Sequence, residues 1–166
     1  MFECQQFWYV VYTRPRWEKK IARVLDEKGI NHYCPLNRVY RQWSDRRKVV
    51  LEPLFKGYVF VSLPEEQKWD ILKIDGIINF VHWLGVPAKV RQQEIDTIKK
   101  FLYEFKNVEV SDIQLNEKDT VKIIKGVMAD YKGIIIEIIG NKARVKIDSM
   151  GISLSAIFDK KSLVQS

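Results

Sequence analysis

The most constraining feature of the sequence is an uninterrupted apolar run, Phe-Trp-Tyr-Val-Val-Tyr, from Phe7 to Tyr12. A strand with one solvated face alternates apolar and polar residues, whereas a strand covered on both faces is apolar throughout. The residues of the run are aromatic or β-branched, and such residues favour strands. We therefore expect a central β-strand with other structure packed against each of its faces.

An amphipathic helix is predicted directly after this strand. Pro15 suits the first turn of a helix, and Gly29 suits the position just past the last turn. At about 100° per residue, one face collects four apolar side chains: Trp17, Ile21, Val24 and Leu25. The opposite side collects four basic side chains: Arg16, Lys19, Lys20 and Arg23. This basic stripe is consistent both with a solvated face and with a contact to a polyanion.

Turn residues and hydrophobic periodicity divide the rest of the first 106 residues. Strands are predicted over 32–40, which Pro35 interrupts, and over 49–51, 54–63 and 77–83. Helices are predicted over 64–76 and from Gln92 to about residue 105. The order β-α-β-β-α-β-α is that of a split βαβ fold with a small additional hairpin. The predicted fold class of this part is α+β.

The sequence changes character near residue 107. Of the 20 aromatic residues, 18 precede this position, and residues 107–118 are mostly polar. Short strands are predicted over 120–125, 133–139, 142–147 and 152–158, with Gly140-Asn141 as a hairpin turn. Several short strands in a small module favour a barrel, because closure hides the strand edges. We therefore expect a domain over 1–106, a linker over 107–118 and an all-β domain over 119–166.

Charge is concentrated at the front of the chain. Residues 1–50 contribute +6 of the net charge of +7, which indicates a polyanionic partner. No apolar run reaches the roughly 18 residues of a membrane span, and the first residues do not resemble a secretion signal. Two cysteines, Cys4 and Cys34, are too few for a disulfide framework or a Cys-rich zinc site. A cytoplasmic protein without a membrane partner is expected.

No residue constellation predicts catalysis. The two histidines, His32 and His82, are far apart in the sequence and lack evident partners. The chain has no phosphate-binding loop, no Gly-x-Gly-x-x-Gly motif and no nucleophile motif, and no pair of carboxylates stands out. We expect a binding protein that is not an enzyme and that uses no metal or cofactor.

Motifs spread over residues 7–164 resemble the NusG family of transcription elongation factors. In the first part these motifs are Trp8–Thr13, Glu18–Lys20, Glu52–Val61, Gly76–Val81 and Gly85–Ala88. In the second part, Asp119–Ile123, Gly126 and Tyr131–Gly133 are similar to a KOW module. The resemblance implies a ferredoxin-like NusG N-terminal (NGN) domain followed by a KOW barrel. The chain looks most like the specialised antiterminators, the RfaH-like and UpxY-like proteins, which serve particular long operons.

The resemblance also implies partners and a function. Members of the family bind RNA polymerase at the clamp helices of the β′ subunit and reach the β subunit, and they suppress pausing and termination. The clamp-binding positions are matched by Tyr12, Tyr58 and Phe60, and the β-subunit contact by Lys68, Trp69 and Asp70. The basic helix matches the region that faces upstream DNA and the non-template strand. The DNA-binding candidates are Arg16, Lys19, Lys20, Arg23 and Lys28, together with Arg41, Arg46, Arg47 and Lys48 on a basic hairpin. A monomer is expected.

Three positions depart from the family pattern. Lys56 stands where the family usually has proline, Val127–Asp130 replaces a Gly-Pro-Phe-x-Gly pattern, and Met150–Ser153 replaces a strand that contains Phe-Gly-Arg. The last two departures weaken the case for binding to termination factor Rho, while a ribosomal contact through the KOW module stays an expectation. Some relatives refold this module into helices, but the strand preference of Ile134–Ile139 favours a barrel here.

An RNA-binding module is the alternative function. Lys56–Leu63 matches five of the seven specified positions of the RNP1 pattern of RNA-recognition motifs, although Val59 and Leu63 depart from it. The split βαβ order also fits that class, and KOW modules of the ribosomal type can bind RNA. Co-purification with RNA polymerase, or with RNA after nuclease treatment, distinguishes the two functions.

Overall fold

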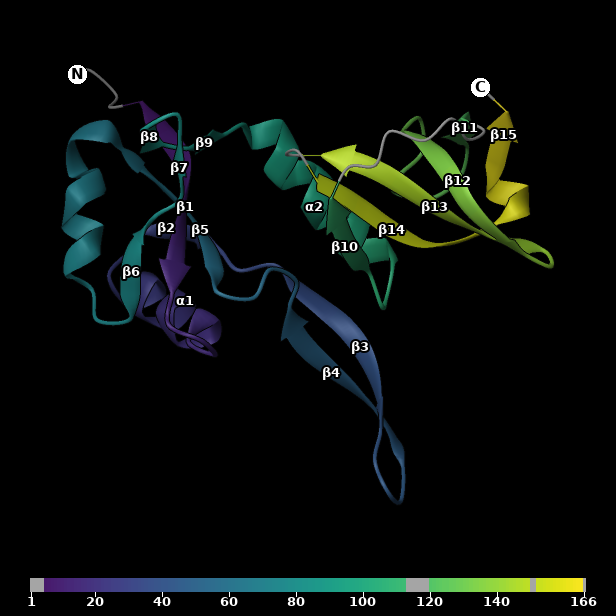
Figure 1. Ribbon diagram of the computed structural model, residues 1–166, viewed down its shortest axis with the longest axis horizontal. Coiled ribbons are helices and arrows are strands. Elements are labelled where there is room, and N and C mark those ends of the chain that lie inside the picture. The colour runs from purple at the N-terminus through teal and green to yellow at the C-terminus, as the bar shows by residue number, and fades with distance from the viewer. Residues whose placement is uncertain (1–4, 113–119, 150–151, 166) are drawn as a thin grey trace. The chain divides into compact units, whose positions relative to one another are not determined.

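The computed structural model describes residues 5–112, 120–149 and 152–165 (Figure 1). The chain divides into two compact units, one made of residues 1–35 and 55–95 and the other of residues 36–54 and 96–166. The two units differ from the domains predicted from the sequence, because residues 36–54 and 96–106 group with the C-terminal part of the chain. The predicted domain boundaries stay a prediction. No helix of the described part is long and apolar enough to cross a bilayer.

The first unit is built on an antiparallel sheet. Its strands are β1 (Gln6–Thr13), β2 (Asn31–Tyr33), β5 (Tyr58–Pro64), β6 (Ile77–Phe80) and β9 (Lys89–Val90). The strand order is β2-β5-β1-β6, and β9 also pairs with β1. Helix α1 (Glu18–Glu27) follows β1, and the 3-10 helix η1 (Glu65–Lys73) follows β5. This order confirms the predicted α+β, split βαβ fold.

The central position of β1 explains its uninterrupted apolar run. On one face, Tyr9 and Val11 are fully buried in a core that includes Ile21 of α1 and Ile71 of η1. On the other face, Trp8 is 7% exposed, whereas Tyr12 is 38% exposed. The prediction that both faces of β1 are covered is therefore confirmed for most of the strand. At the C-terminal end of β1, the face that carries Trp8 and Tyr12 is exposed to solvent.

Helix α1 starts later than the position of Pro15 suggests. Arg16 adopts a φ of 67°, which a right-handed helix cannot include, and the helix begins at Glu18. Its end is as predicted: Gly29 has a φ of 69°, and the Ile30 N–H donates to the carbonyl of Leu25 at 2.9 Å.

The second unit contains a two-stranded ribbon, most of one helix and a six-stranded antiparallel sheet. The ribbon consists of β3 (Leu36–Gln42) and β4 (Arg47–Pro53), and helix α2 (Gln92–Glu104) enters this unit at Asp96. The sheet consists of β10 (Glu109–Asp112), β14 (Ile152–Asp159), β13 (Lys142–Ser149), β12 (Lys132–Ile139), β11 (Thr120–Ile123) and β15 (Leu163–Gln165), in that spatial order. A short 3-10 helix, η2 (Lys160–Ser162), precedes β15. The sheet confirms the predicted all-β module.

Strand β10 lies inside the segment that the sequence predicts as a linker. It pairs with β14, with Val110 opposite Leu154. The rest of that segment, residues 113–118, and residue 119, the first residue of the predicted second domain, lie outside the described residues. Between the two middle strands of the sheet, Gly140 (φ 57°) closes the turn that joins β12 to β13, as predicted.

The base of the ribbon is joined to the residues that follow α2. The side chain of Asn37, which is 7% exposed, donates to the Val108 carbonyl at 2.8 Å and accepts from the Val108 N–H at 3.1 Å. The Arg38 guanidinium donates to the carbonyls of Leu102 at 3.0 Å and Tyr103 at 2.8 Å, so it satisfies acceptors at the C-terminal end of α2.

Candidate functional site

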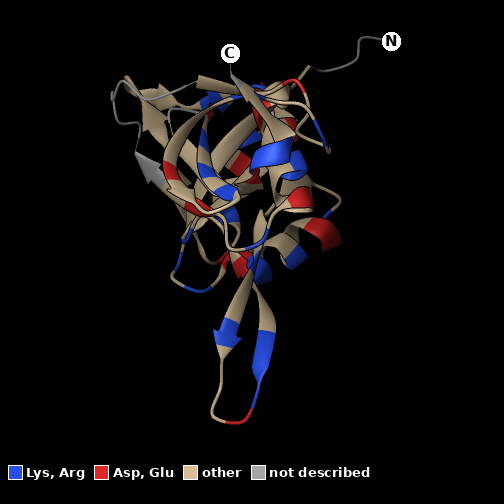
Figure 2. Ribbon diagram, turned by 90° about the vertical axis from the view of Figure 1, so that its right-hand side faces the viewer, with Lys and Arg blue, Asp and Glu red and all other residues tan. Residues whose placement is uncertain are grey.

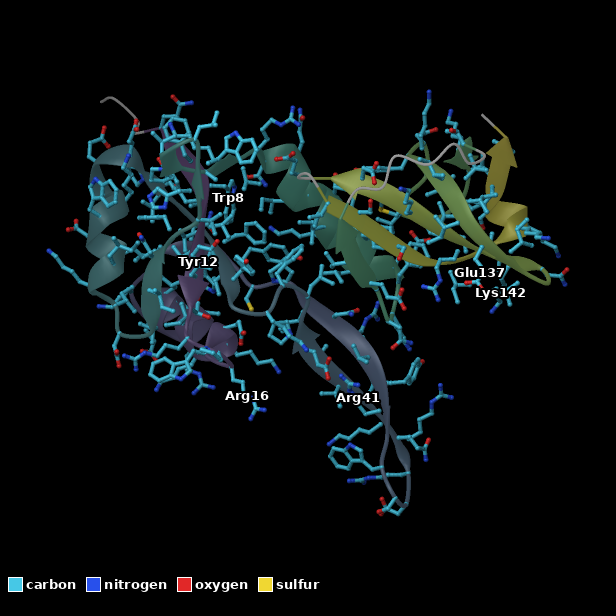
Figure 3. All side chains as sticks on the ribbon, viewed as in Figure 1. Trp8, Tyr12, Arg16, Arg41, Glu137 and Lys142 are labelled. Carbon is cyan, nitrogen blue, oxygen red and sulfur yellow. The ribbon has the colours of Figure 1, made fainter. Side chains whose placement is uncertain are left out.

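Two tyrosines form an aromatic pair on the open end of the first sheet. Tyr12 on β1 and Tyr58 on β5 are directly opposite each other, and their ring centroids are 5.0 Å apart. Tyr12 is 38% exposed, and Figure 3 shows it on β1. Burial raises the pKa of the Tyr58 hydroxyl, and the neighbouring Tyr12 raises it further. The structure therefore brings two of the three predicted clamp-binding residues together, at a partly exposed place.

Phe60, the third residue of that prediction, is only 1% exposed. Its ring stacks on Tyr33 at a centroid distance of 6.3 Å and meets Phe55 edge-on at 5.9 Å. Tyr58 and Phe60 share a face of β5, as alternation along a strand requires, but they differ in burial. In this structure Phe60 is a core side chain beside the tyrosine pair.

A buried carboxylate fixes the turn that leads into Tyr58. Glu18 is 5% exposed, and its Oε1 accepts a hydrogen bond of 2.7 Å from the Gly57 N–H. The Gly57 carbonyl accepts from the Thr13 N–H at 2.8 Å, and the φ of 83° at Gly57 favours glycine. The turn thus joins the start of α1 to the ends of β1 and β5. Sequence reasoning missed this role of Glu18; an acidic residue in the first turn of a helix was the available signal.

The predicted β-subunit contact lies on η1. Trp69 is 53% exposed, and its ring meets that of Phe80 edge-on at 5.8 Å. Lys68 lies 3.5 Å from a carboxylate oxygen of Glu65, and Asp70 lies 3.3 Å from the Lys73 ammonium. Trp69 therefore both packs on the core and presents half of its surface to solvent.

The basic stripe of α1 is solvent-exposed, as its pattern predicted. The four residues of the stripe and the exposed Lys28 at the end of the helix are here called the α1 basic face: Arg16, Lys19, Lys20, Arg23 and Lys28. Figure 3 shows Arg16 just before α1. The Lys20 ammonium lies 3.8 Å from the ring centroid of Trp17, and the Arg14 guanidinium lies 5.0 Å from it. Arg14 was not among the predicted residues, and it also pairs with Asp75 at 3.3 Å.

The second basic run forms the predicted hairpin, the ribbon of β3 and β4. Figure 2 shows basic residues on both of its strands. Arg46 and Lys48 lie 5.8 Å and 5.0 Å from the ring centroid of Trp43, which is 46% exposed. Arg41 is paired with Glu52, its Nε donating at 2.9 Å, so this side chain is partly neutralised.

Tyr40 carries a further cation–aromatic contact on the ribbon. The Arg47 guanidinium lies 4.6 Å from its ring centroid, and the Lys106 ammonium donates to its hydroxyl at 3.0 Å. This hydrogen bond and the positive charge of Lys106 lower the pKa of Tyr40. Cations interleaved with exposed aromatic rings are typical of surfaces that bind single-stranded nucleic acid. The ribbon belongs to the second unit and the α1 basic face to the first.

Both histidines and the described cysteine have local structural roles. A ring nitrogen of His32 lies 3.0 Å from the Ile30 carbonyl, and a ring nitrogen of His82 lies 2.9 Å from the Phe80 carbonyl. Burial raises the pKa of the Cys34 thiol to about 11. Within residues 5–112, 120–149 and 152–165, no cluster of three or more potential metal ligands occurs.

Comparisons with known proteins place the chain in a family. A family model described as "Transcription termination factor nusG" matches residues 6–99. The transcription termination/antitermination protein NusG of Bacillus subtilis is 30% identical over 155 residues, covering 84% of this chain and 86% of that protein. The protein of the same name in Chlamydia trachomatis is 24% identical, covering 84% and 82%.

A solved structure shows the same fold. The structure described as "Domain interaction in Thermotoga maritima NusG" aligns with a TM-score of 0.63 and 23% identity over 97% of both chains. The family model covers more than half of the chain, and the relatives match along most of its length. The chain therefore belongs to the NusG family of transcription termination and antitermination factors.

Proposed function

We propose that this NusG-family protein binds transcribing RNA polymerase and suppresses pausing and termination. In this proposal, Tyr12 and Tyr58 contact the clamp helices of the β′ subunit, with Phe60 supporting them from the core. Lys68, Trp69 and Asp70 contact the β subunit. The protein acts by binding and not by catalysis, as a cytoplasmic monomer.

One observation supports this proposal above the others: the tyrosine pair is partly exposed but held rigidly. The rings are in contact, the strands that carry them are paired in register, and Glu18 and Thr13 fix the turn before Tyr58. Rigid aromatic side chains lose little conformational entropy when they are buried at an interface, and they are frequent among its strongest contacts.

The basic residues supply the nucleic-acid part of the proposal. The α1 basic face and the ribbon residues Arg46, Arg47 and Lys48 would neutralise phosphates of the non-template or upstream DNA, so binding would weaken with salt. Because Arg41 is paired with Glu52, we expect it to contribute less. The same proposal has three further parts. The protein serves particular long operons, its KOW module contacts the ribosome, and it does not bind Rho.

The test is a binding and elongation assay with purified RNA polymerase on a long template, with and without Rho. Tyr12→Ala and Tyr58→Ala should each weaken binding to polymerase by about tenfold or more. Tyr103→Ala is the matched control, because Tyr103 is also an exposed tyrosine (76%) but lies on α2. If both variants bind polymerase as the control does, the assigned face is wrong.

RNA binding remains the second candidate function, and the ribbon is the observation that favours it. Trp43 and Tyr40 offer exposed rings with cations beside them. The burial of Phe60 weighs against an RNA-recognition motif, because such a motif stacks bases on exposed aromatic rings of this strand. Retention of RNA after nuclease treatment, without affinity for polymerase, would favour this alternative.

A further inference from the structure

An open cavity of about 530 Å³ lies in the first unit, and residues of both α1 and η1 line it. Much of its lining is aliphatic and consists of Val24, Ile30, Leu63, Ile71 and Ile74. Leu63 and Ile71 are buried, whereas Val24, Ile30 and Ile74 are only partly buried. The proposed function uses lysines at the edge of this cavity, but it assigns no role to the aliphatic part.

One side of the cavity is a row of α1 residues with a cation at each end. Lys20, Val24 and Lys28 line the cavity at intervals of four residues, so they form one ridge of the helix. Lys28 is the C-cap residue, and its φ of −85° keeps the right-handed helical conformation. The α-carbons of Lys20 and Lys28 are therefore about 12 Å apart along the helix axis. The ridge presents an apolar centre between two positive charges.

The two lysines of this ridge carry charge that the protein itself does not neutralise. Both carboxylates that line the cavity have a cation beside them: Asp70 lies 3.3 Å from the Lys73 ammonium, and Asp75 lies 3.3 Å from the Arg14 guanidinium. Among the residues that the structure describes, neither lysine of the ridge forms an ion pair. The cavity thus has an electrostatic match for a partner with two acidic groups.

The lining of the cavity favours a protein over a nucleic acid. An unstacked base binds by stacking on an open aromatic ring. Trp17 is the aromatic residue that lines the cavity, but the Lys20 ammonium lies 3.8 Å from its ring centroid, and a Cβ atom at Gly76 would lie 2.3 Å from its Cε3. The ring is therefore already packed, and what remains accessible is the aliphatic surface, which suits apolar side chains of a helix.

We propose that this cavity is a docking groove for an acidic amphipathic helix of a protein partner. Apolar side chains of that helix pack on Val24, Ile30 and Ile74, and two of its carboxylates, about two turns apart, pair with Lys20 and Lys28. The inference goes beyond the proposed function and does not depend on polymerase binding. A helix in this groove also excludes DNA from two residues of the α1 basic face, and that consequence alone rests on the proposed function.

A synthetic helix tests the groove directly. The probe is a fluorescent, stapled peptide of about four turns, with two glutamates two turns apart and leucines between them on the same face. A peptide of the same composition in scrambled order is its control. Anisotropy titrations use the full chain, and methyl NMR signals locate the site. We expect the probe to bind about tenfold more tightly than the scrambled peptide and to shift the signals of Val24, Ile30 and Ile74.

Val24→Gln tests the apolar centre of the ridge. It should weaken binding of the probe by about tenfold, because the amide group cannot pack on the apolar face of the helix. Binding of a single-stranded DNA oligonucleotide should stay as in the wild type, and the fold should be retained because Val24 is partly exposed. Val164→Gln is the matched control, since Val164 is a valine with 42% exposure in the second unit.

Charge reversal tests the two ends of the ridge. The double variant Lys20→Glu, Lys28→Glu should bind the probe about tenfold more weakly, and it should regain affinity for a second probe that has lysines in place of the glutamates. The double variant Lys19→Glu, Arg23→Glu is the matched control, because it changes the charge of α1 equally at residues outside the lining of the cavity. Its affinity for either probe should change by less than about threefold at physiological salt.

Each contrary outcome overturns the proposal. If the scrambled peptide binds as tightly as the probe, or if Val24→Gln and the double variant of the ridge bind the probe as the wild type does, the groove is wrong. If Val24→Gln instead loses affinity for the DNA oligonucleotide or for phosphatidylglycerol vesicles and not for the probe, the occupant is a base or a lipid. Binding of the probe is measured without polymerase, so this proposal and the proposed function fail separately.

Discussion

The packing around Gly76 makes a strong quantitative prediction. A Cβ atom at this position would lie 2.3 Å from Cε3 of Trp17 and 2.9 Å from Cδ1 of Ile21. The φ of Gly76 is 98°, which disfavours any residue with a Cβ. For Gly76→Ala, the backbone strain costs about 1–2 kcal/mol. Overpacking of the core adds about 1–3 kcal/mol. Together these effects lower the free energy of unfolding by roughly 2–5 kcal/mol, a large part of the stability of an ordinary domain.

Gly29→Ala is the matched control, because it separates strain from overpacking. Gly29 has a φ of 69°, but a Cβ there would meet no atom within 4 Å. This variant should therefore show the strain alone, about 1–2 kcal/mol. The measurement is urea denaturation of both variants, followed by circular dichroism. If Gly76→Ala is no more destabilised than Gly29→Ala, the close contact with Trp17 does not determine the cost.

Three further predictions concern residues of the first unit. Glu18→Ala should lower the free energy of unfolding by about 1.5–3 kcal/mol, because the buried hydrogen bond to the turn before Tyr58 is lost, and it should also weaken polymerase binding. Phe60→Ala should cost about 3–5 kcal/mol in denaturation experiments, as expected for a fully buried aromatic ring. Alkylation of Cys34 at pH 8 should be about a hundredfold slower in the folded than in the unfolded chain, because its pKa is raised from 9.0 to about 11.

Each of these predictions has a control. Glu18→Gln keeps an oxygen acceptor for the Gly57 N–H and should retain more stability than Glu18→Ala. Tyr12→Ala should cost much less stability than Phe60→Ala, because Tyr12 is 38% exposed. Alkylation is measured in a Cys4→Ser background, so that only Cys34 reacts. Equal effects within any pair would contradict the role assigned to that residue.

The raised pKa of Cys34 also gives a pH dependence with a definite sign. The folded chain holds the thiol proton more tightly than the unfolded chain does, so this group stabilises the fold below about pH 9. Its contribution is lost as the pH rises from 9.0 to about 11. Denaturation midpoints that decline between these pH values in the wild type, and less in Cys34→Ala, would agree with this reasoning.

Local sequence patterns predicted the helices and strands well. They did not predict features that depend on pairing between residues far apart in the sequence. The run from Phe7 to Tyr12 and the face of α1 carry their own periodicity, so strand and helix were predicted correctly. The strand predicted over 32–40 is in fact two strands, β2 and β3, which belong to different sheets. Pro35 marked the interruption, but no local pattern states which partner each half will find.

The same limit applies to the candidate site. Tyr12 and Tyr58 are neighbours because of the register between β1 and β5, which depends on residues far apart in the sequence. Phe60 was predicted as an interface residue, and its burial follows from Tyr33 and Phe55, whose positions the sequence pattern does not give. The hydrogen bond from the Gly57 N–H to Glu18 is likewise a tertiary feature.

The attachment of the ribbon has a mechanical consequence. Asn37 and Arg38 tie the base of β3 to residue 108 and to the last carbonyls of α2, whereas the contacts of the turn from Trp43 to Arg46 are local, among them the hydrogen bond of 2.8 Å from the Trp43 N–H to the Arg46 carbonyl. The base of the ribbon is therefore anchored, and the C-terminal end of α2 determines the direction in which the ribbon extends. A force applied to the basic tip would therefore reach α2 along the two strands and through the hydrogen bonds of Asn37 and Arg38.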